Sequence, residues 1–222
     1  LPEDSLCTQE SPIFNTLQIP RGGEYRLTLA DGTQVWLNSQ TRLRYPITFS
    51  GDKREVYLEG EAYFDVFHDP AHPFYVKTKS LDVKVLGTSF NVKAYRNSGV
   101  VETSLVEGVV SVKDNVLRPD IQATYYEQSG DFSYRKIKGE NYRLRKEQMF
   151  VFEEERLDDI LQEMARWYDF EVFYQNPEMA EKRFGFKLEK YEHVDSLLKI
   201  LELTGEVKFE MLGKSLTVKS GS

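Results

Sequence analysis

The stretch Glu24-Tyr-Arg-Leu-Thr-Leu-Ala-Asp31-Gly32-Thr33-Gln-Val-Trp36-Leu-Asn38 decides the fold class of this chain. Leu27 and Leu29 alternate with polar residues before Asp31-Gly32, and Val35 and Leu37 do so after it. Alternation of this kind is typical of strands that bury one face. Because Asp-Gly favours positive φ at both positions of a two-residue turn, the stretch predicts a β-hairpin.

Similar short segments continue to about residue 126 and are separated by glycine-containing turns. The expected strands are 25–29, 34–38, 54–58, 62–66, 74–78, 83–86, 90–94, 101–105 and 109–112. Many short strands at this spacing predict an all-β sandwich or jelly-roll-like domain over residues 16–128. Residues 1–15 show little periodicity and are interpreted as a flexible lead-in.

The hydrophobic period changes after residues 129–148, a polar and basic stretch that we interpret as a connector. Helical spacing of apolar residues appears at 157–168 and 194–201, and strands are expected at 150–152, 171–174, 183–188, 207–211 and 215–218. The order β-α-β-β-α-β-β predicts a small α+β domain over residues 149–222. The fold class is therefore mainly β, with a sandwich followed by a compact α+β domain.

Composition and charge narrow the class of partner. The net charge of −7 argues against nucleic acid, which needs a contiguous basic face. The one basic cluster is interpreted as a solvated hairpin or connector and comprises Arg135, Lys136, Lys138, Arg143, Arg145 and Lys146. Cys7 has no partner for an internal disulfide. No segment approaches the ~20 consecutive apolar residues of a membrane span, and the start without Met suggests a fragment of a longer polypeptide.

We expect no catalytic site, no cofactor and no metal site. His68 and His72 have the i, i+4 spacing of a helical metal site, but Pro70 and Pro73 prevent a regular helix there. No Gly-x-Ser-x-Gly elbow, phosphate loop or dinucleotide fingerprint occurs.

Two further hypotheses remain open. A hydrolase could use Glu59 and Glu61, which would lie roughly 7 Å apart on one strand face, between the two carboxylate separations of glycosidases. Gly60 between them suggests a bulge that points the two side chains apart. A carbohydrate- or small-ligand-binding sandwich would use Trp36 and the tyrosines, and this hypothesis predicts an exposed aromatic platform.

Several blocks of the first domain occur in a characteristic order. The motif residues are Asp31, Gly32, Thr33, Asn38, Gly60, Glu61, Phe64, Gly87, Thr88, Phe90, Asn91, Glu107 and Gly108. In this order they resemble the periplasmic region of FecR-type transmembrane anti-sigma factors, the ferric-citrate-regulator family. We interpret them as turn and core determinants rather than partner contacts. In two places the chain departs from the family: Pro119-Asp120 replaces Pro-Gly, which favours a type I turn over type II, and Leu144 replaces a tryptophan.

The C-terminal region also resembles a known extension of that family. Its matching blocks are Phe150-Val-Phe152, Arg166-Trp167-Tyr168-Asp169 and Phe184-Gly185-Phe186. This extension is similar to the short N-terminal domain of secretins and TonB-dependent receptors.

The resemblance implies a protein that transmits a signal and catalyses nothing. It implies a single-pass inner-membrane protein whose membrane anchor lies upstream of this chain, with a cytoplasmic part that holds an extracytoplasmic-function sigma factor. The present chain would then lie in the periplasm and contact the signalling domain of a TonB-dependent outer-membrane transporter. Partner binding is expected within Phe150 to Val218, because small sheets keep exposed edges to which a strand can add.

Overall fold

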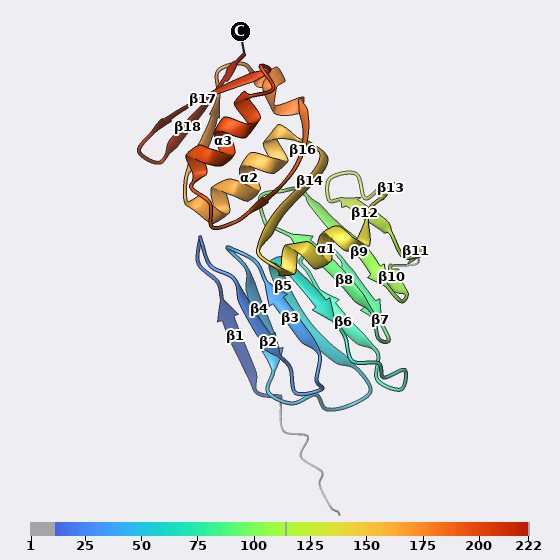
Figure 1. Ribbon diagram of the computed structural model, residues 1–222. Coiled ribbons are helices and arrows are strands. Elements are labelled where there is room, and N and C mark those ends of the chain that lie inside the picture. Colours follow the sequence, from blue (N-terminus) through green and yellow to red (C-terminus); the bar gives the residue numbers. More distant parts are fainter. Residues whose placement is uncertain (1–11, 114, 222) are drawn as a thin grey trace, which may run out of the picture.

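The structure is a computed structural model that describes residues 12–113 and 115–221, so Cys7 and most of the expected lead-in lie outside the described residues. Figure 1 shows a large β domain, coloured blue to green, and a smaller mixed domain, coloured orange to red, with helix α1 (Gly139–Lys146) lying between them. The predicted fold class is confirmed. No helix in the described ranges is long and apolar enough to cross a membrane.

The β domain is a 13-stranded curled sheet within the described residues. Its strands are β1 (Phe14–Gln18), β2 (Tyr25–Thr28), β3 (Gln34–Leu37), β4 (Arg42–Pro46), β5 (Arg54–Asp65), β6 (Phe74–Lys77), β7 (Asp82–Val85), β8 (Ser89–Ala94), β9 (Val100–Glu107), β10 (Val110–Val112), β11 (Asn115–Leu117), β12 (Ile121–Tyr126) and β13 (Phe132–Lys136). The first layer contains β1, β4, β6, β7, β10 and β11, and the second layer contains β2, β3, β8, β9, β12 and β13.

Strand β5 belongs to both layers because it folds back at Gly60. Its first half pairs with β4 and β6, and its second half pairs with β3 and β8. A straight 12-residue strand would place its two ends roughly 40 Å apart. In the structure, however, Arg54, the first residue of β5, donates through its guanidinium to the carbonyl oxygen of Phe67, two residues beyond the end of β5, at 3.0 Å. Gly60 has φ of 112°, and a Cβ there would lie 2.5 Å from Oγ1 of Thr41, so the fold requires glycine. The two strands expected at 54–58 and 62–66 are therefore two limbs of one strand.

Five strands were not among those expected: β1, β4, β11, β12 and β13. Strand β13 is exposed along almost its whole length, so no apolar alternation marks it in the sequence. The segment expected to be a connector, 129–148, contains β13, paired with β12, and helix α1.

The turn at Asp120 differs from the expected type I. Asp120 has φ of 62°, whereas the third residue of a type I turn has negative φ. Aspartate tolerates this region, and its carboxylate accepts a hydrogen bond from the N–H of Gly139 at 2.9 Å, which joins the turn to the start of α1.

The second domain has the predicted order of elements. It contains β14 (Met149–Arg156), α2 (Leu157–Tyr168), β15 (Glu171–Tyr174), the 3-10 helix η1 (Pro177–Glu181), β16 (Arg183–Glu189), α3 (Val194–Glu202), β17 (Val207–Leu212) and β18 (Ser215–Ser220). Strand β14 pairs with β16, and β18 lies between β15 and β17. In Figure 1, α2 and α3 lie between the β17–β18 hairpin and the β14–β16 pair.

Each domain has its own apolar core. Phe64, Phe74 and Phe90 are fully buried in the first, where the rings of Phe64 and Phe90 stack at 5.3 Å. Leu161 and Met164 of α2 are fully buried in the second. Because neither large core extends across the boundary, the residues between the domains decide how the domains are held together.

A polar junction between the domains as candidate functional site

The motif residues identified in the sequence fall into separate places in the fold. Phe64 and Phe90 lie in the core. Others form turns: the carboxylate of Asp31 accepts from N–H and Oγ1 of Thr33 at 3.0 and 2.8 Å and pairs with the buried Arg54 at 2.7 Å. These positions make turn and core contacts within the first domain, and the interpretation that they do not contact a partner stays a prediction.

Further turn residues pack closely at the β7–β8 and β9–β10 connections. Gly87 and Gly108 approach neighbouring backbone so closely that a Cβ would lie 2.5 Å from Cα of His68 and 3.1 Å from the carbonyl oxygen of Gly87, respectively. The hydroxyl of Thr88 donates to the carbonyl oxygen of Val109 at 2.9 Å, which ties the two connections together. Glu107 is exposed beside them.

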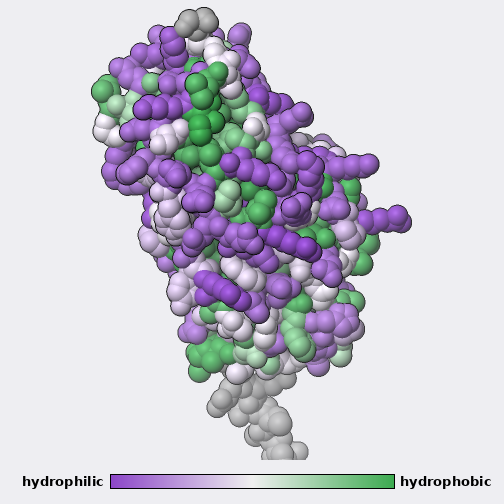
Figure 2. Space-filling model, in the orientation of Figure 1, coloured by the Kyte–Doolittle hydropathy of each residue, from purple (hydrophilic) through white to green (hydrophobic). Residues whose placement is uncertain are grey.

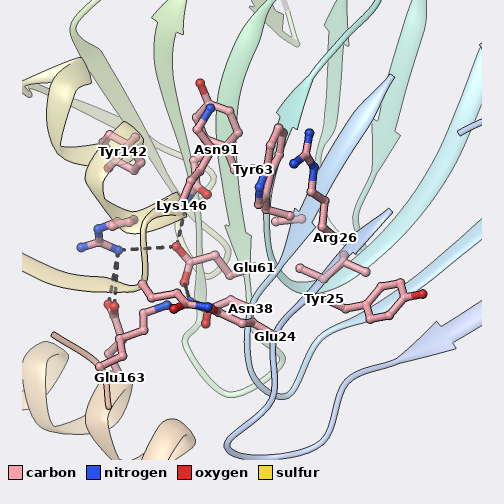
Figure 3. Close-up of a pocket in the computed structure, with 16 residues that line it drawn as sticks. Glu24, Tyr25, Arg26, Asn38, Glu61, Tyr63, Asn91, Tyr142, Lys146 and Glu163 are labelled. Atoms are coloured by element: carbon pink, nitrogen blue, oxygen red, sulfur yellow. Dashed lines mark hydrogen bonds and ion pairs between the residues drawn. The ribbon is translucent and has the colours of Figure 1, made fainter. Parts of the chain in front are cut away.

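The remaining motif residues, Asn38, Glu61 and Asn91, come together on the outer face of the second layer. Side chains alternate along β5, so Ala62 and Phe64 enter the core while Glu61 points outward. The Glu61 carboxylate is 4% exposed. It accepts hydrogen bonds from the side-chain amides of Asn38 at 3.2 Å and Asn91 at 3.0 Å (Figure 3).

Arg145 connects this carboxylate to the second domain. Its guanidinium lies 3.6 Å from Glu61 and 3.4 Å from Glu163, a residue of α2 whose side chain is 6% exposed (Figure 3). It also donates to the carbonyl oxygen of Val151 in β14 at 2.9 Å. One side chain from α1 therefore joins β5 to both α2 and β14.

The surrounding charges keep Glu61 ionised. Burial opposes ionisation, but Lys93, Arg145 and Arg166, together with the Asn91 hydrogen bond, hold the pKa of Glu61 below its ordinary value. Burial likewise opposes the charge on Arg145, and Glu163 and Glu61 outweigh it, so its pKa is raised. The junction is an array of mutually neutralised buried charges, in which the loss of one leaves the others unbalanced.

Other contacts between the domains are also polar. Ion pairs that cross the boundary include Arg21–Asp169 at 3.0 Å, Glu24–Lys190 at 2.9 Å and Arg135–Glu155 at 2.7 Å. On the face shown in Figure 2, hydrophilic residues gather where the domains meet. Polar interfaces between domains resemble those of transient complexes, so relative motion of the two domains is the ordinary expectation.

Sequence reasoning missed Arg145 and Glu163 as members of this site. Arg145 was assigned to a solvated basic cluster, although its side chain is only 21% exposed. Glu163 lies beside the apolar stripe of α2, three residues after Ile160. A charged residue next to the buried face of an amphipathic helix indicates a buried polar contact, and this was the signal available in the sequence.

A cleft of about 340 Å³ lies beside the junction, with Glu61 and Arg145 in its lining. Its walls also include the half-buried Trp36 and the buried Tyr63, whose rings contact each other edge to face at 5.8 Å. The guanidinium of Arg26 lies 4.9 Å from the ring centre of Trp36. Trp36 is thus a wall of a cleft rather than part of an exposed platform, and carbohydrate binding stays a prediction.

The residues considered for a hydrolase or a metal site do not converge. Glu59 pairs with Arg96 at 2.7 Å and lines a different cleft from Glu61. His72 hydrogen-bonds to Asp69 at 2.8 Å. In residues 12–113 and 115–221, no group of three or more His, Cys, Asp or Glu side chains has an arrangement that could hold a metal ion.

Comparison with known families identifies the class of protein. Residues 15–111 match the family described as FecR protein, and residues 149–218 match FecR, C-terminal. The two matches together span most of the chain; the first lies within the β domain and the second within the α+β domain. The chain belongs to the FecR family of anti-sigma factors.

Solved structures agree with this assignment. The chain is similar to two crystal structures, at 1.65 Å and 2.50 Å resolution, each described as a candidate anti-sigma factor from Parabacteroides distasonis. Sequence identity is 26% in both, with TM-scores of 0.85 and 0.84; 94% and 95% of this chain and 100% of each matched chain are covered. No curated protein matches the chain.

Proposed function

We propose that this chain is the signal-receiving region of a membrane-anchored anti-sigma factor. In this proposal the chain lies in the periplasm, a membrane anchor and a cytoplasmic sigma-binding part precede it, and the regulated partner is an extracytoplasmic-function sigma factor. The signal comes from the signalling domain of a TonB-dependent outer-membrane transporter. The observation that carries the proposal is the match of both domains, in order, to the two FecR families.

The second domain is the proposed docking site for the transporter. Among the described residues, β16 pairs only with β14, which leaves one edge of this seven-residue strand without a strand partner. On the β17 edge, by contrast, the N–H of Phe209 already donates to the carboxylate of Glu202 at 2.7 Å. A strand added to β16 would gain main-chain hydrogen bonds without any reactive group, which suits a protein that relays a signal.

The test is calorimetric titration of the full 222-residue chain with the signalling domain of the transporter encoded beside it. We expect a complex with Kd of about 1 μM or tighter. Lys187→Glu on β16 should weaken it, because the substitution reverses a charge on the proposed edge. Lys208→Glu on β17 is the matched control, since both lysines are exposed. Absence of heat and of any complex with the wild-type chain would refute the proposal; equal loss in both variants would refute the choice of edge.

A further inference from the structure

The cleft beside the junction contains two cations that stand apart from its ion pairs. Of its lining residues, Glu24 pairs with Lys190, and Glu61 and Glu163 share Arg145. Arg26 instead contacts the side-chain amide oxygen of Gln34. Neither Arg26 nor Lys146 lies within ion-pair distance of a carboxylate in the described ranges, so the cleft is left with an excess of positive charge.

Both cations lie against the aromatic wall. The Nζ of Lys146 is 4.5 Å from the ring centres of both Trp36 and Tyr63, and the guanidinium of Arg26 is 4.9 Å from the ring centre of Trp36. Burial lowers the pKa of Lys146, with Arg143 and Arg26 adding to the shift against the opposing effect of Asp65. A partly buried cation of this kind gains from an anion placed beside it.

The volume and lining suit a small molecule. At about 30 Å³ per water molecule, the 340 Å³ of the cleft corresponds to roughly eleven waters, enough for a ligand with one ring. Flat aromatic walls favour a flat apolar body, and a few convergent polar groups fix its orientation.

We propose that this cleft binds a small organic acid, with the carboxylate between Lys146 and Arg26 and an attached planar ring against Trp36 and Tyr63. The proposal goes beyond the signal-receiving function and is independent of it, because it involves neither the β16 edge nor the transporter. Arg145, Glu61 and Glu163 form the adjoining wall, so an occupied cleft also touches the junction between the domains.

The test uses phenylacetate as the probe, with the full chain at low ionic strength, where screening is least. Phenylacetamide supplies the same ring without the charge, and acetate supplies the charge without the ring. Calorimetry should give a Kd of about 1 mM or tighter for phenylacetate and at least about tenfold weaker binding for the other two. A charge-assisted hydrogen bond is large enough to give a difference of this size.

Lys146→Met should weaken phenylacetate binding at least about tenfold. Arg143→Met is the matched control, because Arg143 lies on the same helix with its side chain 63% exposed, and that variant should bind like the wild type. An unchanged circular-dichroism spectrum and urea midpoint would show that each variant is folded. The proposal is overturned by equal affinities for phenylacetate and phenylacetamide, by wild-type affinity in Lys146→Met, or by no binding at about 10 mM.

Discussion

Replacing Arg145 by methionine should undock the second domain from the first. The substitution keeps an extended, unbranched side chain but removes the cation shared by Glu61 and Glu163. Both carboxylates are almost fully buried, so neither can recover its lost partner by turning into water. The carbonyl oxygen of Val151 also loses a donor at 2.9 Å.

The structure sets the size of the effect. At an effective dielectric constant of about 20, charges 3.4 to 3.6 Å apart interact by about 5 kcal/mol per pair before desolvation is counted. Removing one member of a buried ion pair costs about 3–5 kcal/mol in practice. Lys93 and Arg166 remain near Glu61 and supply part of the missing charge. We therefore expect Arg145→Met to lower the free energy of unfolding by about 3 kcal/mol, the lower end of that range.

Each domain contains one natural reporter, Trp36 in the first and Trp167 in the second. Urea unfolding should therefore be followed by fluorescence in Trp36→Phe and Trp167→Phe backgrounds. With an m value of about 2 kcal/mol per M, a loss of 3 kcal/mol lowers the midpoint by about 1.5 M. Since Arg145 connects the domains, the variant should also separate the two transitions if they coincide in the wild type.

Two further variants distinguish a shared ion pair from simple loss of packing. Adding Glu163→Gln to Arg145→Met should restore at least half of the lost stability, because it removes one uncompensated charge. Arg143→Met, on the exposed side of the same helix, should leave both midpoints unchanged. The reasoning fails if Arg145→Met shifts neither midpoint by more than about 0.3 M, or if Glu163→Gln makes the loss larger.

Three other changes test the fold and the charge of Glu61. The pKa of Glu61 is lower in the folded state than its ordinary value of 4.5. The ionised carboxylate therefore stabilises the fold above pH 4.5, and this stabilisation is lost as the pH falls through the folded pKa. The difference in free energy of unfolding between the wild type and Glu61→Gln, measured by chemical unfolding, should accordingly become smaller in acid. Gly60→Ala should lower the free energy of unfolding by about 2–4 kcal/mol, because the position has positive φ and the added Cβ clashes with Thr41. Gly51 has φ of 90° but no atom near the position of an added Cβ, so Gly51→Ala should lower the same free energy by about 1 kcal/mol. Phe64→Ala should lower thermal stability by about 3–5 kcal/mol, while Phe67→Ala, at a side chain 59% exposed, should have little effect.

The spacing of apolar residues and the turn residues predicted those elements whose form depends on neighbouring residues in the sequence. The apolar spacing at 157–168 and 194–201 predicted α2 and α3 closely, because each helix buries one stripe against its own domain. The hairpin at Asp31-Gly32 was also predicted, but the expected two-residue turn was wrong. Leu29 pairs with Thr33, which leaves a three-residue loop, and Gly32 has positive φ whereas Asp31 does not. Strand β13 was not predicted, since an exposed strand shows no alternation of burial.

The junction could not be derived in the same way. Glu61, Arg145 and Glu163 are far apart in the sequence and meet only after β5 has folded back and α1 has crossed the second layer. Each residue alone resembles an ordinary charged surface position. Only their common burial in the folded chain shows that they neutralise one another.

The composition of the junction has a consequence for signalling. Asn38 and Asn91 donate hydrogen bonds to Glu61 without adding charge, so Arg145 remains available to Glu163 across the boundary. A partner that bound only the undocked state could shift the equilibrium between docked and undocked domains by no more than its differential affinity for the two. Reversing a 99:1 preference takes about 5.5 kcal/mol, similar to the about 3–5 kcal/mol at stake in breaking one buried ion pair. A partner present at about 1,000 times its Kd for the undocked state would supply about 4 kcal/mol. That amount is within the range for breaking one buried ion pair, so a junction of this kind suits opening by a binding partner.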